Sequence, residues 1–174
     1  MQSLLRGLRY RVVVPVFRSP HTPEHTARGV ANGVFWGLTP SVGLQTLAIL
    51  ATWLVARKVF GKESSLLQAF IWVWVNNPLT MAPMYYVFYV TGLWLLGDAG
   101  HAGGYDTFVA LWESNTAGGW WDGMLAIARS IGVPTAIGSI PYAVIGSALS
   151  YHWALRVVRR RKARLLHARA TSIP

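Results

Sequence analysis

Long apolar runs separated by short charged stretches dominate this chain. Apolar residues fill most of residues 27–56, 64–97 and 123–153, and almost all charged residues lie outside these runs. A stretch of about 20 apolar residues is long enough to cross a bilayer as a helix. The pattern predicts an all-α, polytopic integral membrane protein.

The first apolar run is too long for one straight helix. Residues 27–56 would extend roughly 45 Å as a helix, whereas a hydrocarbon core is about 30 Å thick. Thr39 followed by Pro40 stands near the middle, and Thr is favoured at a helix N-cap and Pro at the first helical position. We therefore expect two half-helices, about 24–38 and 40–56.

The second run, residues 64–97, is interrupted near its middle by Pro78. Proline has no N–H and disfavours helical conformation in the residue before it. Asn77 supplies a capping side chain, and the same arrangement of a capping residue before proline occurs at Thr22-Pro23. We expect a proline-broken helix here and a helix start at Thr22.

Charge distribution indicates which side each loop faces. Basic residues cluster at both termini and in the loop from Arg57 to Lys62, whereas residues 98–122 contain acidic residues and tryptophans but no Lys or Arg. Because cytoplasmic loops are enriched in Lys and Arg, both termini should be cytoplasmic and residues 98–122 external.

This orientation fixes how often each run crosses. Residues 27–56 begin and end on the same side, so they should form a re-entrant hairpin. Residues 64–97 would then cross once, and residues 123–153 would return. The alternative places the 98–122 loop inside and makes all three runs re-entrant.

The chain divides into a membrane domain, residues 23–153, flanked by two basic segments. Residues 1–22 are expected to form an interfacial helix, with a solvated basic helix as the alternative, and residues 154–174 an amphipathic tail. The net charge of +10 makes anionic lipid headgroups the expected partner of both ends. Nucleic acid is not expected, because no recognition module accompanies the basic residues.

Two series of small residues recur at helical spacing and predict close helix packing. They are Gly29, Gly33 and Gly37 in the first run, and Ser139, Ala143 and Ser147 in the last.

Catalytic and metal-binding patterns are weak. The string from His21 to His25 fits H-x-x-E-H, but Pro23 inside it marks a helix start and separates the two histidines from a common helical face. The chain has no cysteine, and its histidines are scattered over loops and ends. We therefore expect no enzyme activity, no cofactor and no metal site.

The two breaks at membrane depth suggest a ligand site. Helix N-termini present free N–H groups and a positive dipole end, which suits an anion. Neutral polar side chains near the breaks would line the site, with arginines at its cytoplasmic rim. The candidate residues are Thr39, Pro40, Ser41, Gln45, Asn76, Asn77, Pro78 and Thr80, with Arg28 and Arg57 at the rim.

Three strings resemble the DUF2062 family of small bacterial membrane proteins: Arg28-Gly29-Val30-Ala31-Asn32-Gly33-Val34-Phe35-Trp36-Gly37-Leu38-Thr39-Pro40, then Gly43-Leu44-Gln45, then Asn77-Pro78-Leu79-Thr80-Met81-Ala82-Pro83-Met84-Tyr85-Tyr86. The resemblance covers roughly residues 15 to 155. It implies the bacterial cytoplasmic (inner) membrane and no particular mechanism.

The expected function is that of a transporter, a flippase-like protein or an anionic lipid-headgroup binder. No acidic residue lies within the first two apolar runs, so coupling to ions through a buried carboxylate is poorly supported. The alternative is a non-catalytic scaffold, either a homo-oligomer or an accessory subunit of a larger membrane complex.

Overall fold

A computed structural model describes residues 22–41, 43–98, 100, 103–106, 108–110 and 131–170. Its regular elements are all helices, which confirms the predicted all-α class for this part of the chain. The expected N-terminal interfacial helix, most of the acidic loop and residues 123–130 lie outside it. The elements are α3 (Pro23–Gly37), α4 (Gln45–Phe60), α5 (Leu66–Trp72), the 3₁₀ turn η2 (Val73–Val75), α6 (Pro78–Leu95) and α9 (Val133–Ala170).

The first half-helix forms as predicted. Thr22 caps α3, its hydroxyl accepting a hydrogen bond from the backbone N–H of His25 at 3.3 Å, and Pro23 is the first helical residue. The helix ends at Gly37, close to the predicted end.

The second half-helix begins later than predicted. Thr39 does not cap it and Pro40 does not start it, because α4 begins at Gln45 after Leu44, which makes no side-chain cap hydrogen bond. The Thr39 hydroxyl instead donates to the Trp36 carbonyl at 2.9 Å and so closes the end of α3. Gly43, with φ of 83°, turns the chain between the two helices.

The third segment breaks where Pro78 predicts. Helix α5 ends at Trp72 and continues directly as the 3₁₀ turn η2, which ends at Val75. Helix α6 then begins at Pro78. Asn77 and Thr80 cap the new helix reciprocally, since Asn77 Oδ1 accepts from the Thr80 N–H at 3.2 Å and Thr80 Oγ1 accepts from the Asn77 N–H at 3.1 Å. The backbone N–H groups of Asn77 and Thr80 are therefore both hydrogen-bonded, and Pro78 has no N–H that would need a partner.

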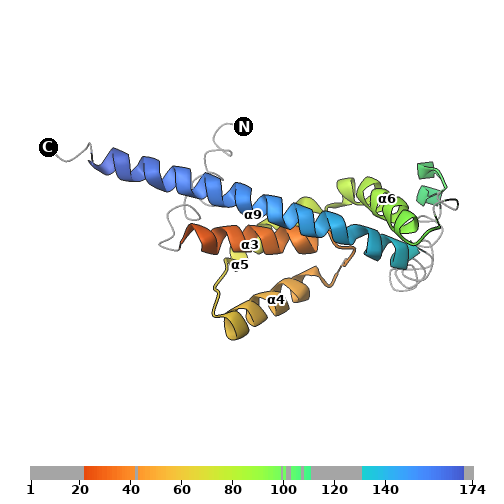
Figure 1. The fold of residues 1–174 in the computed structure, drawn as a ribbon, viewed down its shortest axis with the longest axis horizontal. Coiled ribbons are helices and arrows are strands. Elements are labelled where there is room, and N and C mark those ends of the chain that lie inside the picture. Colours follow the sequence, from red (N-terminus) through yellow and green to blue (C-terminus); the bar gives the residue numbers. More distant parts are fainter. Residues whose placement is uncertain are drawn as a thin grey trace.

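Helix α9 is the longest element, with 38 residues, and the other helices are arranged along it (Figure 1). It runs antiparallel to α3, because Arg159 of α9 bonds Glu24 at the start of α3 while Gly146 lies beside Leu38 just after its end. It also runs antiparallel to α6, because Gly138 lies beside Phe88 and Pro134 beside Gly92. Consequently α3 and α6 cover successive stretches of α9.

Glycines set the closest helix contacts. A Cβ added to Gly29, Gly33 or Gly37 would meet backbone or Cβ atoms of α5 and its flanks, and at Gly33 it would clash with the Ala69 carbonyl oxygen. The small-residue series on α3 thus lies against α5 and η2, which run parallel to α3. On α9, Ser139 and Ala143 are buried, while Ser147 is half-buried.

The tightest contact of α9 with α6 falls elsewhere, at a glycine pair that the sequence analysis did not single out. A Cβ on Gly138 would clash with the Phe88 carbonyl oxygen, and a Cβ on Gly92 with the Pro134 carbonyl oxygen.

Two apolar clusters form the core, one for each half of α9. The first joins α3 to α9 and contains Ala27, Val30, Val34 and Ala154. The second contains Tyr85, Phe88, Phe108 and Ile131, and so joins α6 to Phe108 within the acidic loop and to Ile131 just before α9. Leu38 packs against both clusters.

Within the described residues, one helical stretch is both long and apolar enough to cross a membrane, Val133–Arg164. The same helix continues without interruption through residue 153, where the sequence suggested a separate tail. At 100° per residue its basic groups from Arg156 to Arg164 cover most of the circumference, and the remaining sector contains the buried Val158. The amphipathic character of the tail stays a prediction.

Candidate functional site

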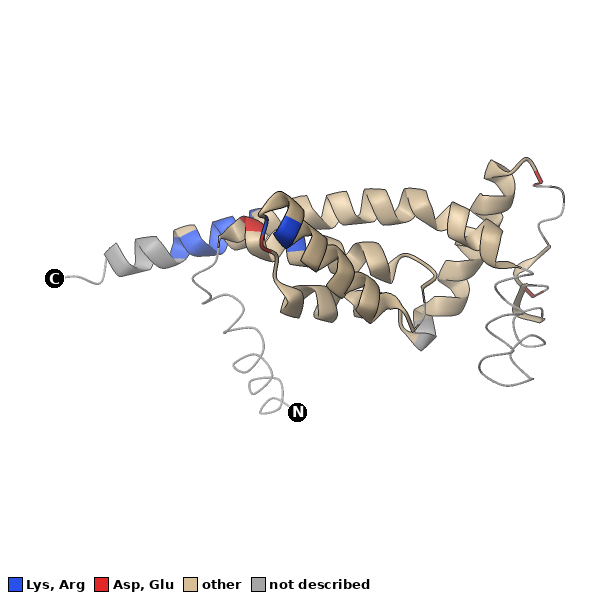
Figure 2. Ribbon diagram, turned by 90° about the horizontal axis from the view of Figure 1, so that it is seen from below, with Lys and Arg blue, Asp and Glu red and all other residues tan. Residues whose placement is uncertain are grey.

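Charge is segregated along the molecule. Figure 2 shows the Lys and Arg residues gathered toward the end where α9 finishes, with acidic residues both there and at the opposite end. Residues 29–56, 64–97 and 130–155 contain no Asp, Glu, Lys or Arg. We call the basic region the cationic end; its described basic residues are Arg28, Arg57, Lys58, Lys62, Arg156, Arg159, Arg160, Arg161, Lys162 and Arg164.

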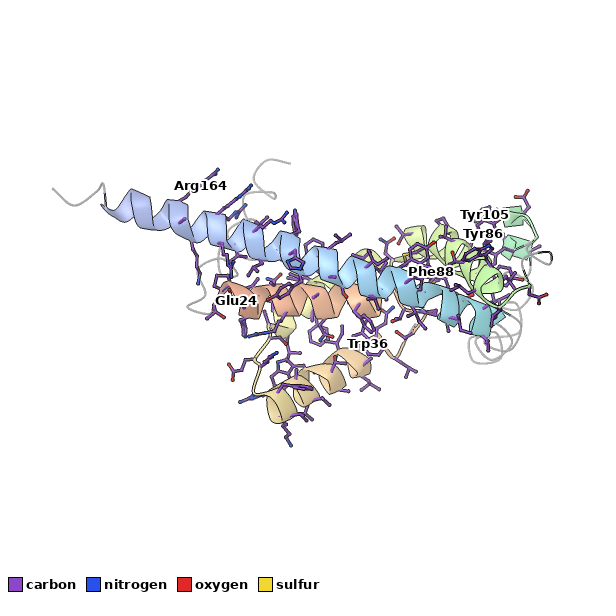
Figure 3. The ribbon with its side chains drawn as sticks, in the orientation of Figure 1. Glu24, Trp36, Tyr86, Phe88, Tyr105 and Arg164 are labelled. Carbon is purple, nitrogen blue, oxygen red and sulfur yellow. The ribbon has the colours of Figure 1, made fainter. Side chains whose placement is uncertain are left out.

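One ion pair joins α9 to the start of α3 at the cationic end. Arg159 donates a hydrogen bond to the Glu24 carboxylate at 2.7 Å; Figure 3 shows Glu24 at this end of α3. This hydrogen bond, together with one from the backbone N–H of Glu24, holds the pKa of the Glu24 carboxyl below its ordinary value of 4.5. Glu24 therefore stays ionised in mildly acidic conditions.

A second cluster at this end is built around Glu63 in the loop between α4 and α5. The Arg28 Nε donates to the Glu63 carbonyl oxygen at 2.9 Å, and the Arg57 Nε lies 3.9 Å from the Glu63 carboxylate. The Arg57 guanidinium also lies 5.4 Å from the centre of the Trp53 ring. Two guanidinium groups from different helices thus contact one residue, Arg28 at its backbone carbonyl and Arg57 near its carboxylate.

One helical turn farther along α3, polar side chains join α3 to α4. The Thr52 hydroxyl lies 2.9 Å from Asn32 Oδ1 and 2.8 Å from the Ala48 carbonyl oxygen, and it accepts a hydrogen bond from the Trp36 indole N–H at 3.2 Å. Figure 3 shows Trp36 between the two helices. We call Asn32, Trp36 and Thr52 the polar clasp.

The sequence analysis did not identify the clasp or Glu63. The signal was present, because Arg28, Asn32 and Trp36 recur every fourth residue and so share one face of α3. Only the pairing with Thr52 required the three-dimensional arrangement.

The predicted residues at the first break lie in the loop after α3. Thr39 Oγ1 and Ser41 Oγ are 3.2 Å apart, and Pro40 lies between them in the bend. Gln45 is the first residue of α4 and is half-buried. The hydroxyl groups of Thr39 and Ser41 thus hydrogen-bond to each other, and Thr39 also bonds a carbonyl group at the end of α3.

The predicted residues at the second break hydrogen-bond mainly to one another. Besides the capping pair, Thr80 Oγ1 donates to the Val75 carbonyl oxygen at 2.9 Å. The Asn76 amide donates to the Tyr85 hydroxyl at 3.1 Å, while its Oδ1 is buried without a partner among the described residues.

The two breaks lie at the same level, because a Cβ on Gly37 at the end of α3 would approach the Val73 carbonyl oxygen of η2 to 3.0 Å. What ends there, however, is α3 and η2, which present carbonyl groups. The first-turn amides of α6 at Asn77 and Thr80 are already occupied, and α4 starts beyond the 39–44 loop. The structure therefore does not bring together two amide-rich ends in the way that the sequence analysis expected.

The rim residues Arg28 and Arg57 are brought together, but away from the breaks. Arg28 lies nine residues before Gly37, where α3 ends, which is about 14 Å of helix. In the described part of the chain no group of three or more His, Asp or Glu side chains could hold a metal ion; His21 of the H-x-x-E-H string lies outside it.

The profile of the DUF2062 family, described as an uncharacterized protein conserved in bacteria, matches residues 5–166. Neither a curated protein nor a solved structure matches the chain. The match covers nearly all of the sequence, including the broken helices and the cationic end just described. The chain therefore belongs to the DUF2062 family.

Proposed function

We propose that this chain is a multi-pass protein of the bacterial cytoplasmic membrane that binds anionic lipid headgroups at its cationic end. The observation that carries the proposal is the segregation of charge, because an uncharged body lies between a strongly basic end and an end with acidic residues. Headgroup phosphates attract Lys and Arg beside an apolar helix.

The dimensions of α9 support this placement. Its uncharged part, from Val133 to Leu155, is roughly 35 Å long at 1.5 Å per residue, close to a hydrocarbon core of about 30 Å. The basic stretch from Arg156 to Arg164 follows directly and adds about 12 Å, enough to cross a headgroup layer of about 5–8 Å and reach beyond it. Charges around most of the circumference of α9 suit a helix that passes through this layer.

The path of the chain supports the multi-pass arrangement. Helices α3 and α4 would form the re-entrant hairpin, and α5, η2 and α6 together would cross once in the same direction as α3. Helix α9 would then return. The basic loop at Lys62 and the end of α9 lie on the cytoplasmic side in this arrangement, as the positive-inside rule requires.

Exposed apolar side chains fit a lipid environment. Leu47, Val59, Trp94 and Leu149 are all more than 60% exposed, and they lie on three different helices. A bilayer would cover all of them at once, whereas a single protein partner would cover one face.

Headgroup binding is tested by comparing the thermal unfolding midpoint of the full chain in nanodiscs of phosphatidylcholine alone and of phosphatidylcholine with phosphatidylglycerol. We expect a higher midpoint with the anionic lipid, and a difference that shrinks as salt screens it. Equal midpoints would contradict headgroup binding, and the scaffold alternative would remain.

The orientation is tested by labelling single cysteines, because the native chain has none. Lys62→Cys and Arg164→Cys should react with an impermeant maleimide only from the cytoplasmic side, and Asp98→Cys and Asp106→Cys only from the other side. All four of these residues are exposed. Labelling of positions 62 and 98 from the same face would exclude the proposed crossing.

A further inference from the structure

We infer that α3, α4 and the Glu63 loop bind one anionic phospholipid at the cationic end, with its phosphate between Arg28 and Arg57. We call this part of the surface, from the arginine pair to the polar clasp, the α3–α4 wedge. The inference rests on the proposed function, which places the cationic end at headgroup level, and it adds a defined site and a ligand class to it.

The arginine pair is positioned by the protein before any ligand arrives. Arg28 is held through its Nε by the Glu63 carbonyl oxygen, which leaves its two terminal nitrogens able to donate. Arg57 is held between the Trp53 ring and the Glu63 carboxylate. Planar guanidinium forks match phosphate oxygens in pairs, so two of them at one residue suit a phosphodiester.

Glu63 sets the charge of the site. Its carboxylate lies 3.9 Å from the Arg57 Nε, and the two side chains are 55% and 60% exposed. An exposed ion pair of this kind is weak. The two arginines and Glu63 together carry a net charge of +1, which one phosphodiester neutralises. A phosphate oxygen can therefore replace the carboxylate beside Arg57 without leaving a buried unpaired charge.

The polar clasp continues the site inward. Asn32 lies one turn beyond Arg28 on the same face of α3, about 6 Å deeper, and Thr52 faces it from α4. Polar side chains within an otherwise uncharged apolar segment are costly in lipid and mark paths for polar groups. Here they lie at the depth of the ester-linked glycerol of a lipid whose phosphate is at Arg28.

The outer face of α4 offers an apolar surface for an acyl chain, since Leu54, Val55 and Val59 are 44%, 51% and 69% exposed. Figure 1 shows α4 diverging from α3 toward the end where α4 finishes. Glycines on the other face of α3 pack against α5 and η2, whereas the described side-chain hydrogen bonds between α3 and α4 all involve Asn32 or Trp36 of the clasp. The wedge thus combines a cationic pair, polar side chains and an exposed apolar face, which match the phosphate, glycerol and acyl parts of a phospholipid.

The site is tested with short-chain lipids added to the full chain in neutral detergent. Binding of dioctanoyl phosphatidylglycerol, dioctanoyl phosphatidylcholine and inorganic phosphate is measured by the shift of the thermal unfolding midpoint. We expect the wild type to respond to phosphatidylglycerol, and not to equal concentrations of the other two. Because each arginine supplies charge-assisted hydrogen bonds, Arg28→Gln and Arg57→Gln should each weaken binding at least about tenfold.

Matched controls separate the wedge from general attraction to the cationic end. Arg160→Gln and Arg164→Gln remove the same charge from the far part of α9 and should weaken binding less than about twofold, since exposed charges act weakly. Thr52→Val should weaken binding although it changes no charge. If Arg28→Gln does not fold, Arg57→Gln carries the test, because Arg57 is exposed at the end of α4.

Three results would overturn the wedge. Equal losses in the α3–α4 and α9 variants would mean diffuse attraction, a response to inorganic phosphate alone would mean an ion site without lipid, and an equal response to phosphatidylcholine would mean no headgroup selectivity. The proposed function fails separately, in the nanodisc comparison and the cysteine labelling, neither of which depends on Arg28 or Arg57.

Discussion

At the scale of single residues, glycine and the capping side chains determine this fold more than the large apolar residues do. Gly33 allows the backbone of α3 to touch α5, and Gly138 allows α9 to touch α6. Asn77 and Thr80 make a helix start beside a proline possible. Each of these positions has a consequence that one substitution can measure.

Gly33→Ala should destabilise the chain by about 1–3 kcal/mol, because the new methyl group would meet the Ala69 backbone and an α-helix cannot shift there without losing other contacts. The measurement is the free energy of unfolding in detergent with a chemical denaturant. Gly104→Ala is the control, since nothing lies within 4 Å of a Cβ at that position. Equal effects of the two substitutions would contradict the close packing of α3 on α5.

Asn77→Ala should cost about 0.5–2 kcal/mol, the usual loss when a capping side chain is removed. Asn77→Asp keeps an acceptor for the Thr80 N–H and should recover most of this loss. If the two variants unfold alike, the cap does not stabilise α6. The same measurement in the nanodisc series reports whether Asn77 affects lipid binding, which the wedge does not require.

At the scale of elements, the apolar pattern predicted the breaks correctly and their consequences only in part. Residues around Pro40 and Pro78 interrupt helices as expected from the geometry of proline. Pro83 and Pro141, however, lie inside α6 and α9, so proline alone does not specify a break. The start of α4 at Gln45 was not predictable in the same way. The Thr39 hydroxyl could accept from an N–H of the following helix or donate to a carbonyl of the preceding one, and in the folded chain it donates to the Trp36 carbonyl.

Contacts between elements were less predictable still. Gly29, Gly33 and Gly37 indicated a packing face, but not that α5 would occupy it. The pairing of Asn32 with Thr52 joins residues 20 apart, and no local pattern specifies such a partner. The site at the cationic end therefore became visible only when α3, α4 and the Glu63 loop were placed together.

Thr52→Val should loosen α4 while leaving its helical conformation intact, because valine has the shape of threonine but cannot join Asn32 to Trp36. We expect faster amide hydrogen exchange in α4, with no change in α9. Thr46→Val is the matched control, as Thr46 is exposed on the same helix. Unchanged exchange in α4 would show that other contacts hold the hairpin.

At the scale of the whole molecule, charge is segregated between two ends that α9 links. The pair between Glu24 and Arg159 joins the first described helix to the last one at the cationic end. It is exposed on the arginine side, with 60% of the Arg159 side chain accessible, so its effect on stability is small and best detected through pH.

Because the pKa of Glu24 is lowered in the folded chain, its contribution to stability is complete above the ordinary value of 4.5 and is lost as pH falls through the lower folded value. Thermal unfolding midpoints in detergent, measured from pH 6 downward, should therefore fall less for Glu24→Gln than for the wild type. Arg159→Gln should give the same flattened profile. A wild-type slope in both variants would show that this pair does not couple to folding.

Helix α9 also has a mechanical consequence. It is the longest of the described helices, and α3 and α6 pack against its two halves. In the proposed membrane placement, a bilayer thinner than its roughly 35 Å uncharged length favours tilting of α9. Tilting would carry both attached helices with it and change the angle at which they meet beside Leu38, so membrane thickness would alter the geometry at the chain's midpoint.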